Sequence, residues 1–193
     1  MRDDIAITYR MYKFFIERTK KHISLVNLFL NKILELDIKD INKEILLDES
    51  YLHDSDKFAD PEFAPYVLLT WRYLLRNTDP TFDYPQEIQD KINEATLHHI
   101  TTNKHHPEFW SKQKDSKMLN TENRDEPPEE MIDATDMPLS YVACMTADWL
   151  AMAKEKGTNP NDWADKNVNV RWEFTEDQKN LIYALLRELY DGN

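Results

Sequence analysis

The chain has 193 residues, of which 24 are lysine or arginine and 36 are aspartate or glutamate, so its formal net charge is −12. Non-specific nucleic-acid binding and polybasic membrane anchoring both need clustered positive charge, which this acidic composition disfavours. The single cysteine, Cys144, cannot form an internal disulfide, and no apolar run approaches the ~20 residues of a membrane span. We therefore expect a cytoplasmic protein without a membrane partner.

Glycine is scarce, with two residues in the whole chain. Tight β-turns use glycine because it tolerates positive φ, and phosphate-binding loops use clustered glycines so that the backbone can approach the phosphate. The scarcity therefore predicts an all-α protein and disfavours P-loop and dinucleotide-binding domains. We expect a compact single domain over residues 1–193, built as a bundle of about five to seven helices.

Apolar residues at helical spacing, with proline and cap residues at the ends, divide the chain into predicted helices. These are 4–36, 41–53, 60–76, 85–102, 137–156, a short turn at 159–165, and a last helix that starts at 175. Asp60 is a predicted N-cap followed by Pro61 at the first helical position. Gly157 is expected to end its helix, and Thr175 is expected to cap the last one.

The segment from about residue 111 to 137 differs from the rest of the chain. It is polar and charged, and it contains Pro127-Pro128. Such a composition buries little apolar surface, so we expect a long polar loop or lid that is the most mobile part of the protein.

Two polar residues fall on otherwise apolar helical faces. His22 shares a face with Val26 and Phe29, and Asp148 shares one with Cys144. A carboxylate in an apolar stripe is costly unless it pairs with a cation or binds a metal. Taken singly, each residue fits an ordinary structural role, as a satisfied core histidine and a salt-bridged aspartate.

The histidines fall into three places along the sequence: His22, the dipeptide His53-Asp54, and a later cluster. The cluster consists of His98, His99, His105 and His106. Imidazole nitrogens together with carboxylate oxygens are the ligand mixture of Zn, Mn, Fe, Co and Ni sites. Ligands on separate helices can converge in a bundle core, where the fold fixes their geometry. We therefore expect a divalent transition metal as cofactor, with one or two ions.

One His, then His-Asp, then a later Asp, each on its own helix, is a pattern that resembles the HD superfamily of metal-dependent phosphohydrolases. The resemblance implies an HD-domain-like fold and one metal site formed by His22, His53, Asp54 and Asp148. The run His53-Asp54-Ser55-Asp56-Lys57 is similar to the branch that reads His-Asp-x-x-Lys, in which the position of Lys57 helps to hold a phosphate or a bound water. In members with one metal, the resemblance implies that Asp54 or a nearby acid handles the proton.

A second resemblance covers roughly residues 21–189. The run from Leu97 to Trp110 and the run from Asp148 to Met152, together with His53-Asp54-x-x-Lys57, are similar to an uncharacterised family of small phage and bacterial proteins. That resemblance implies no activity.

Further candidates surround these four residues in the sequence. His99 lies over Ile92 on its helix and is the expected inward member of its pair, whereas His98 is the outer one. His99 and His106 are candidate ligands of a second metal. Candidates for contact with a phosphate substrate are Lys57, Arg72, Arg76, His98 and His105. Glu49, one turn before His53, is a candidate general base or partner of a metal ligand.

Three functions remain open at this stage. The first is a phosphohydrolase that acts on a nucleotide or another small phosphate ester. The second is a diiron oxygenase of the HD type, which would use His22, His53-Asp54, His99, His106 and Asp148. The third is a binding or interaction protein with a structural or vestigial metal site. Two bound irons would favour the oxygenase, Mn, Co, Zn or Ni the hydrolase, and no metal the interaction protein.

Overall fold

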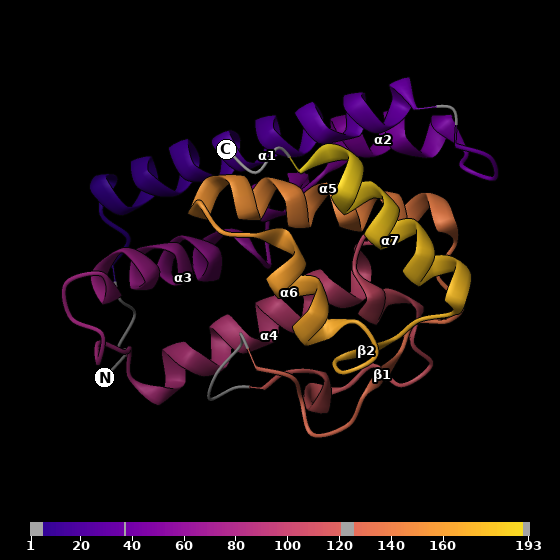
Figure 1. Cartoon of the computed structure of the whole chain (residues 1–193). Coiled ribbons are helices and arrows are strands. Elements are labelled where there is room, and N and C mark those ends of the chain that lie inside the picture. The colour runs from indigo at the N-terminus through magenta and orange to yellow at the C-terminus, as the bar shows by residue number, and fades with distance from the viewer. Residues whose placement is uncertain (1–5, 37, 121–125, 191–193) are drawn as a thin grey trace. The chain divides into compact units, whose positions relative to one another are not determined.

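The structure is a computed structural model of the chain and describes residues 6–36, 38–120 and 126–190. These residues form an all-α fold with seven α-helices, as the sequence predicts (Figure 1). The helices are α1 (Tyr9–Glu35), α2 (Lys43–Leu52), α3 (Phe63–Arg76), α4 (Gln86–Thr102), α5 (Leu139–Lys156), α6 (Pro160–Asn167) and α7 (Glu176–Leu189). Short 3-10 helices are η1 (Ser55–Phe58), η2 (Pro107–Trp110) and η3 (Ser116–Met118), and the strands are β1 (Ile132–Asp133) and β2 (Trp172–Glu173).

The contacts divide the chain into two compact units. Unit 1 takes its residues from Met1–Lys21 and Asp54–His99, and unit 2 from His22–His53 and Ile100–Asn193. Two of the boundaries fall inside helices α1 and α4. The expectation of one domain over residues 1–193 stays a prediction.

Unit 1 is built around an apolar cluster from the first half of α1, from α3 and from α4. Its buried members are Met11, Phe15, Val67, Leu68, Leu69, Tyr84, Ile88 and Ile92. The Phe15 ring contacts the rings of Phe58 and Phe63 at centroid distances of 5.6 and 5.7 Å. Aromatic burial of this kind anchors η1, which directly follows Asp54.

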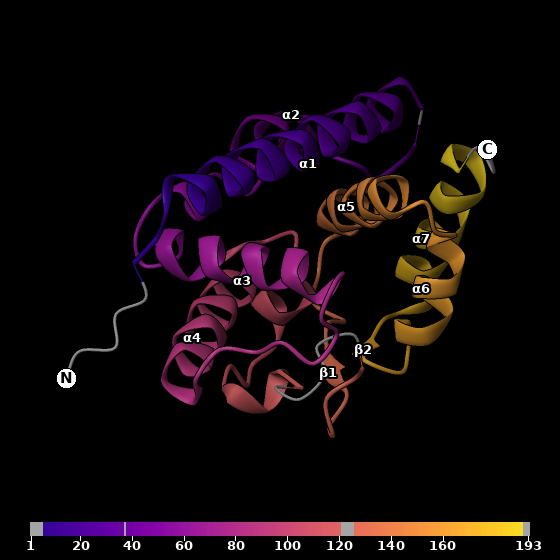
Figure 2. The ribbon, with the colours of Figure 1, turned by 90° about the vertical axis from the view of Figure 1, so that its left-hand side faces the viewer.

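Unit 2 is organised around α5, which contacts α2, α6 and α7 (Figures 1 and 2). Buried side chains occur on nearly every side of α5, which is typical of a central helix. Helix α7 presents a narrower buried stripe that includes Ile182, Leu185 and Leu186. At the start of α2, the backbone N–H of Asn42 donates to the Ser140 hydroxyl at 2.8 Å, which ties α2 to the first turn of α5.

Two predicted helix boundaries are confirmed, the start of α7 and the end of α5. The predicted starts of α3 and α1 are corrected. Thr175 forms a capping box with Gln178, and Gly157 ends α5 with a φ of 67°. Helix α3 begins at Phe63 rather than Pro61, because the Ala59 carbonyl accepts from the Glu62 and Phe63 amides and residues 59–62 form a turn.

The predicted first helix starts too early. Helix α1 begins at Tyr9, and the Thr8 hydroxyl accepts from the Met11 amide at 3.3 Å. The Thr8 hydroxyl satisfies an amide that has no partner inside the helix, so it caps the N-terminal end of α1. The predicted start at Asp4 lies outside the described residues.

The segment 111–137 buries more than its composition predicts. Met118, Ile132, Ala134 and Met137 are all buried, and β1 pairs in parallel with β2, with Ile132 opposite Trp172. The Gln178 side chain donates to the carbonyls of Ala134, Thr135 and Met137, which fixes the end of the segment. Residues 121–125, in its middle, lie outside the described part of the chain, and the mobility of the segment stays a prediction.

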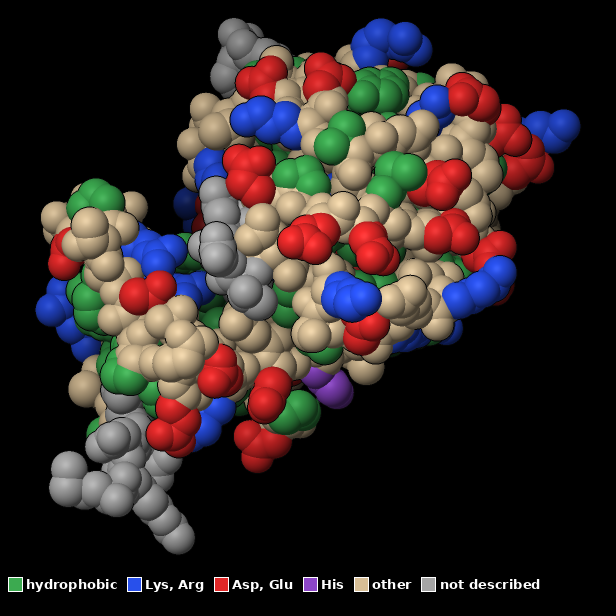
Figure 3. Space-filling view, turned by 90° about the horizontal axis from the view of Figure 1, so that it is seen from below, with side chains coloured by type: hydrophobic (Ala, Val, Ile, Leu, Met, Phe, Trp, Pro, Cys, Tyr) green, Lys and Arg blue, Asp and Glu red, His purple; other side chains and the backbone are tan. Residues whose placement is uncertain are grey.

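The surface carries both signs of charge. Figure 3 shows acidic side chains spread over one face, with lysine and arginine between them and little histidine. Among the described residues, no helix combines the length and the apolar character that a membrane crossing requires.

Candidate metal centre

Three potential metal ligands meet inside unit 2, one from α1, one from α5 and one from the residue that follows α2. The Nε2 atom of His22 lies 3.0 Å from the Asp148 Oδ1 atom and 3.5 Å from the His53 Nε2 atom. His22 and His53 are buried, and the Asp148 side chain is 18% exposed. His22, His53 and Asp148 thus form a group whose ligand atoms all lie within 4.8 Å of one another.

The local sequence explains how these three side chains reach one point. His22 lies on the buried side of α1, where Val26 and Leu30 are also buried. His53 directly follows α2, and its backbone N–H donates to the Glu49 carbonyl at 2.8 Å. Asp148 lies in the middle of α5, the central helix of the unit. Each ligand is therefore held by a packed helix or by its last turn.

Two glutamates stand behind the two imidazole rings. The Glu49 Oε1 atom lies 3.1 Å from the His53 Nδ1 atom, and the Glu155 Oε2 atom lies 3.7 Å from the His22 Nδ1 atom. Both glutamates thus face an Nδ1 atom, whereas the two Nε2 atoms lie 3.5 Å from each other. Burial raises the pKa of the Glu49 carboxyl, but hydrogen bonds from His105 and His53 outweigh it and lower that pKa to about 2.

The later histidines continue this arrangement in unit 2. His105 is buried, and its Nδ1 atom lies 2.6 Å from the same Glu49 Oε1 atom. Its ring lies 4.3 Å from the His53 ring and 4.4 Å from the His106 ring. His105 and His106 both lie in the loop between α4 and η2, and Pro107 disfavours a helical backbone at His106. Glu49 is therefore shared by two imidazoles.

A second polar cluster forms inside unit 1 around Asp54. Its backbone has a φ of 57° and a ψ of 15°, a left-handed conformation that aspartate tolerates better than most residues. The Asp54 carboxylate accepts from the Lys57 ammonium at 2.6 Å and lies 3.2 Å from the His99 Nε2 atom. The side chains of Asp54 and His99 are each 2% exposed. Within unit 1, Asp54 is thus held by Lys57 and His99.

His99 is surrounded by carboxylates. Its Nδ1 atom lies 2.9 Å from Glu62 and 3.3 Å from Asp56, in addition to the contact of Nε2 with Asp54. Burial and the nearby Lys57 ammonium lower the pKa of His99. The three carboxylates outweigh both effects and raise that pKa to about 10.

The unit 2 group has the spacing that a metal requires. Two ligand atoms that each lie ~2.05 Å from a tetrahedral Zn²⁺ are about 3.3 Å apart. The observed separations of 3.0 and 3.5 Å bracket that value. Two imidazoles and one carboxylate also leave coordination positions for water or substrate, as in catalytic sites. The residues therefore fit a divalent transition metal.

The structure places the other predicted site residues as follows. Lys57 contacts Asp54, and its ammonium also lies 5.1 Å from the centre of the Tyr66 ring. Arg72 and Arg76 both bind Asp83, at 3.1 and 2.6 Å. The His98 side chain is 43% exposed and contacts Glu62 at 2.9 Å. His98 is thus the outer and His99 the inner residue of the pair, as the helical spacing predicts.

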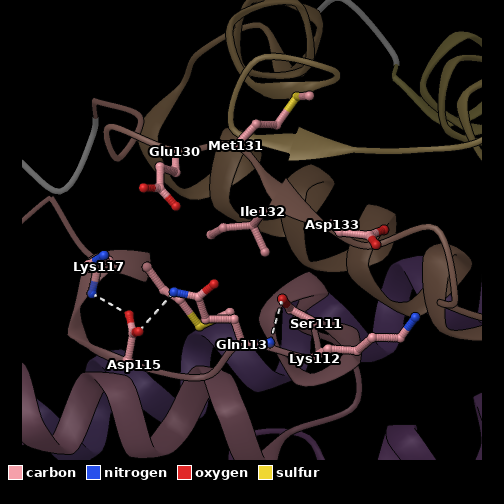
Figure 4. A pocket seen from close by; sticks show the side chains of 10 residues that line it. Ser111, Lys112, Gln113, Asp115, Lys117, Glu130, Met131, Ile132 and Asp133 are labelled. Carbon is pink, nitrogen blue, oxygen red and sulfur yellow. Dashed lines mark hydrogen bonds between the residues drawn. The ribbon is translucent and has the colours of Figure 1, made fainter.

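A hollow of about 190 Å³ lies elsewhere in unit 2, between residues 111–118 and 130–133. Figure 4 shows the Ile132 side chain facing Gln113 and Ser111, with acidic and lysine side chains toward both ends. None of its lining residues is a histidine. The hollow is therefore distinct in composition from the candidate metal centre.

Three acidic residues in these clusters were missed by the sequence reasoning. Glu155 follows Asp148 by seven residues on α5, so the same face carries both carboxylates. That spacing is a signal that the sequence does contain. Asp56 and Glu62 precede α3 in a stretch without regular periodicity, and only the fold brings them to His99.

The chain matches the family described as a family of unknown function (DUF5662) over residues 11–188, and it belongs to that family. No curated protein and no solved structure gives a significant match. The family description names no activity, so functional inference has to start from the site itself.

Proposed function

We propose that this protein is a metal-dependent phosphohydrolase of the HD type that acts on a nucleotide or another small phosphate ester. The observation that carries the proposal is the convergence of His22 Nε2, His53 Nε2 and Asp148 Oδ1 at separations of 3.0 and 3.5 Å. Two imidazoles and a carboxylate bring three potential ligand atoms together, an arrangement that a cation stabilises. The order of these residues along the chain agrees with the HD resemblance.

The chemistry follows from the donor set. A divalent ion held there would polarise a phosphoryl oxygen and lower the pKa of a bound water. His22, His53 and Asp148 would bind the ion, and the burial of both histidines keeps bulk water from competing for their Nε2 atoms. The resemblance also assigns Asp54 to the metal, and that assignment stays a prediction because the Asp54 carboxylate contacts Lys57 and His99 inside unit 1.

The test is a metal-reconstitution assay. The purified chain is stripped with a chelator, reloaded separately with Mn²⁺, Co²⁺, Ni²⁺, Zn²⁺ or Fe²⁺, and assayed for release of phosphate from a panel of nucleotides and simple phosphate esters. We expect hydrolysis with at least one metal, and we expect Asp148→Asn to lower it at least about 100-fold. Asp162→Asn, at an exposed position of α6, is the matched control and should retain wild-type activity.

A second candidate has a specific observation in its favour. Two histidines and one carboxylate are also the ligand set of non-haem Fe(II) oxygenases. Activity that requires iron and consumes O₂ would favour this oxygenase over the hydrolase. If the wild-type chain binds none of these metals and hydrolyses nothing on the panel, a binding or interaction protein would be the remaining candidate function.

A further inference from the structure

We infer that unit 1 has a docking surface for a protein segment that is rich in aspartate and glutamate. The surface lies between α3 and the part of α1 that belongs to unit 1. We call it the cationic face, and it consists of Arg10, Phe14, Arg18, Trp71 and Tyr73. The inference goes beyond the proposed function, because these residues lie outside the candidate metal centre.

Positive charge is concentrated in these two stretches of the chain. Residues 6–21 carry five cations and one acid, Glu17, and α3 carries two arginines and no acid. The Glu17 carboxylate lies 3.7 Å from Lys13, and Asp83 contacts both arginines of α3, so part of the charge is offset. A cationic excess remains, in a chain whose net charge is −12.

The arginines of α1 are held against aromatic rings of α3, which runs beside the first half of α1 in Figures 1 and 2. The Arg10 Cζ atom lies 5.4 Å from the centre of the Trp71 ring, and the Arg18 Cζ atom lies 6.0 Å from the centre of the Tyr73 ring. The Phe14 ring packs edge-on against Trp71 at 5.9 Å. An aromatic ring attracts a guanidinium at such distances, so both arginines are partly ordered before a ligand binds.

The cationic face is open to a partner. Arg10 is exposed, Arg18 is partly exposed, and Tyr73 is 42% exposed. The two arginines are eight residues apart on α1, which corresponds to ~12 Å along the helix axis. Side chains on one face of an extended segment repeat about every 7 Å, so a short segment with acids at alternate positions spans both arginines.

The chemistry of arginine explains why carboxylates are the expected ligands. A guanidinium presents its N–H donors in a planar fork that matches the two oxygens of a carboxylate. Such charge-assisted hydrogen bonds are stronger than neutral ones, and an arginine can form them while its flat face rests on an aromatic ring. The cationic face therefore offers two ordered carboxylate-binding groups.

A nucleic acid is also anionic, but two observations favour a protein segment. Single-stranded nucleic acid binds by stacking its bases on aromatic rings, whereas the chain's own guanidiniums lie against these rings. Arg18 and Arg72 both lie 6.0 Å from the centre of the Tyr73 ring, and Arg10 lies over Trp71. A strand that extends beyond the cationic face would also meet the acidic remainder of the chain, which repels a continuous row of phosphates.

The experiment measures the fluorescence anisotropy of a labelled, capped peptide of alternating glutamate and serine, with four glutamates, as the full chain without metal is added. We expect the wild type to bind at ~50 mM salt and to bind more weakly as the salt rises, because exposed ion pairs are screened. Arg10→Gln/Arg18→Gln should raise the dissociation constant about 10-fold, as expected for the loss of two partly exposed ion pairs.

Two matched variants separate the cationic face from net charge and from damage to the fold. Lys91→Gln/Lys166→Gln removes the same charge from exposed positions of α4 and α6 and should stay within about twofold of the wild type. Arg10→Lys/Arg18→Lys keeps the charge without the planar fork and should recover part of the loss.

Three results would overturn the inference. They are a wild type that does not bind the peptide, equal affinity of the wild type and Arg10→Gln/Arg18→Gln, and tighter binding of a five-thymidine DNA strand, which has as many charges as the peptide. Asp148→Asn should bind the peptide as the wild type does. Failure of the proposed hydrolase therefore leaves this inference standing, and failure of peptide binding leaves the hydrolase.

Discussion

Two buried polar clusters lie on either side of a single peptide bond, between His53 and Asp54, and they balance their charges differently. In unit 1, the Asp54 carboxylate binds a cation that the chain itself supplies, the Lys57 ammonium, at 2.6 Å. In unit 2, the Asp148 carboxylate faces the His22 and His53 imidazoles, each with a glutamate behind it. The first arrangement includes a buried ion pair, and the second is the one to which our proposal assigns the metal.

The comparison also shows why acidic residues alone are a poor guide to metal binding. His99 contacts three carboxylates, and the Lys57 ammonium lies against one of them, so cationic side chains of the chain itself accompany the acidic residues there. In the unit 2 group, the Nε2 atom of His22 contacts both an Asp148 carboxylate oxygen and the Nε2 atom of His53. In both clusters a glutamate faces the Nδ1 atom of a histidine. The unit 1 cluster includes the Lys57 ammonium beside Asp54, whereas the unit 2 group brings two imidazoles together with Asp148.

The largest expected effect comes from removing the charge of Asp54. Asp54→Asn keeps a residue that tolerates positive φ, but it leaves Lys57 with a mostly buried ammonium and no carboxylate at 2.6 Å. We expect the free energy of unfolding of the chain without metal to fall by about 3 kcal/mol, as for other broken buried ion pairs. Urea denaturation measures the change. Asp54→Asn/Lys57→Met should recover much of the loss, and a loss in Asp54→Asn below about 1 kcal/mol would contradict the ion-pair assignment.

The next largest effect is expected from adding a metal, which should stabilise the chain through the unit 2 group and not through the unit 1 cluster. Zn²⁺ at 100 times its dissociation constant should raise the free energy of unfolding by about 2.7 kcal/mol, because it binds the folded state. Lys57→Met, which alters unit 1, should keep this increment relative to its own metal-free state. Asp148→Asn should lose it. Equal increments in Asp148→Asn and the wild type, measured by urea denaturation with and without Zn²⁺, would show that the ion binds elsewhere.

High pH should weaken the unit 1 cluster in particular. The carboxylates around His99 raise its pKa from an ordinary 6.5 to about 10, so its stabilising contribution is complete below pH 6.5 and is lost as the pH rises toward 10. We expect the stability difference between the wild type and His99→Gln to be about 2 kcal/mol larger at pH 6 than at pH 10. Urea midpoints across this range, without metal, provide the measurement. A difference independent of pH would rule out a charged His99.

Low pH should weaken the unit 2 group, by a smaller amount than high pH weakens the unit 1 cluster. The pKa of Glu49 lies at about 2 instead of 4.5, so its contribution is present above pH 4.5 and is lost as the pH falls toward 2. We expect the wild type to exceed Glu49→Gln by about 1 kcal/mol at pH 6, with the difference closing near pH 2. The same urea series measures it. A constant difference between pH 6 and pH 2 would mean that the Glu49 carboxylate does not favour its ionised form.

Most of the fold could be predicted from the sequence because its signals are local. Two glycines predicted an all-α chain, and Thr175 and Gly157 marked helix ends through backbone chemistry that needs no tertiary context. The segment 111–137 was harder, because Met118 and Ile132 are isolated apolar residues in a polar stretch. Both are buried, and Ile132 is placed by the pairing of β1 with β2, some 40 residues later.

The site was predicted less completely, for a similar reason. His22, His53 and Asp148 could be selected because their positions on apolar faces and their order along the chain both pointed to one place. Asp54 was grouped with them on resemblance, and that grouping stays a prediction. Within unit 1, its left-handed backbone conformation goes with contacts to Lys57 and His99. A single φ of this kind leaves no periodic signal in the sequence, and the same holds for Glu62 beside His99.

The most direct test of the account is a Zn²⁺ titration of the full chain followed through the histidine side-chain nitrogens by NMR. The account predicts that the first equivalent of Zn²⁺ shifts the Nε2 resonances of His22 and His53 together, and that Asp148→Asn abolishes these shifts while the resonances of His99 keep their positions. Perturbation of His99 by the first equivalent, with His22 and His53 unchanged, would place the metal in the cluster that already has its own cation and would contradict the account.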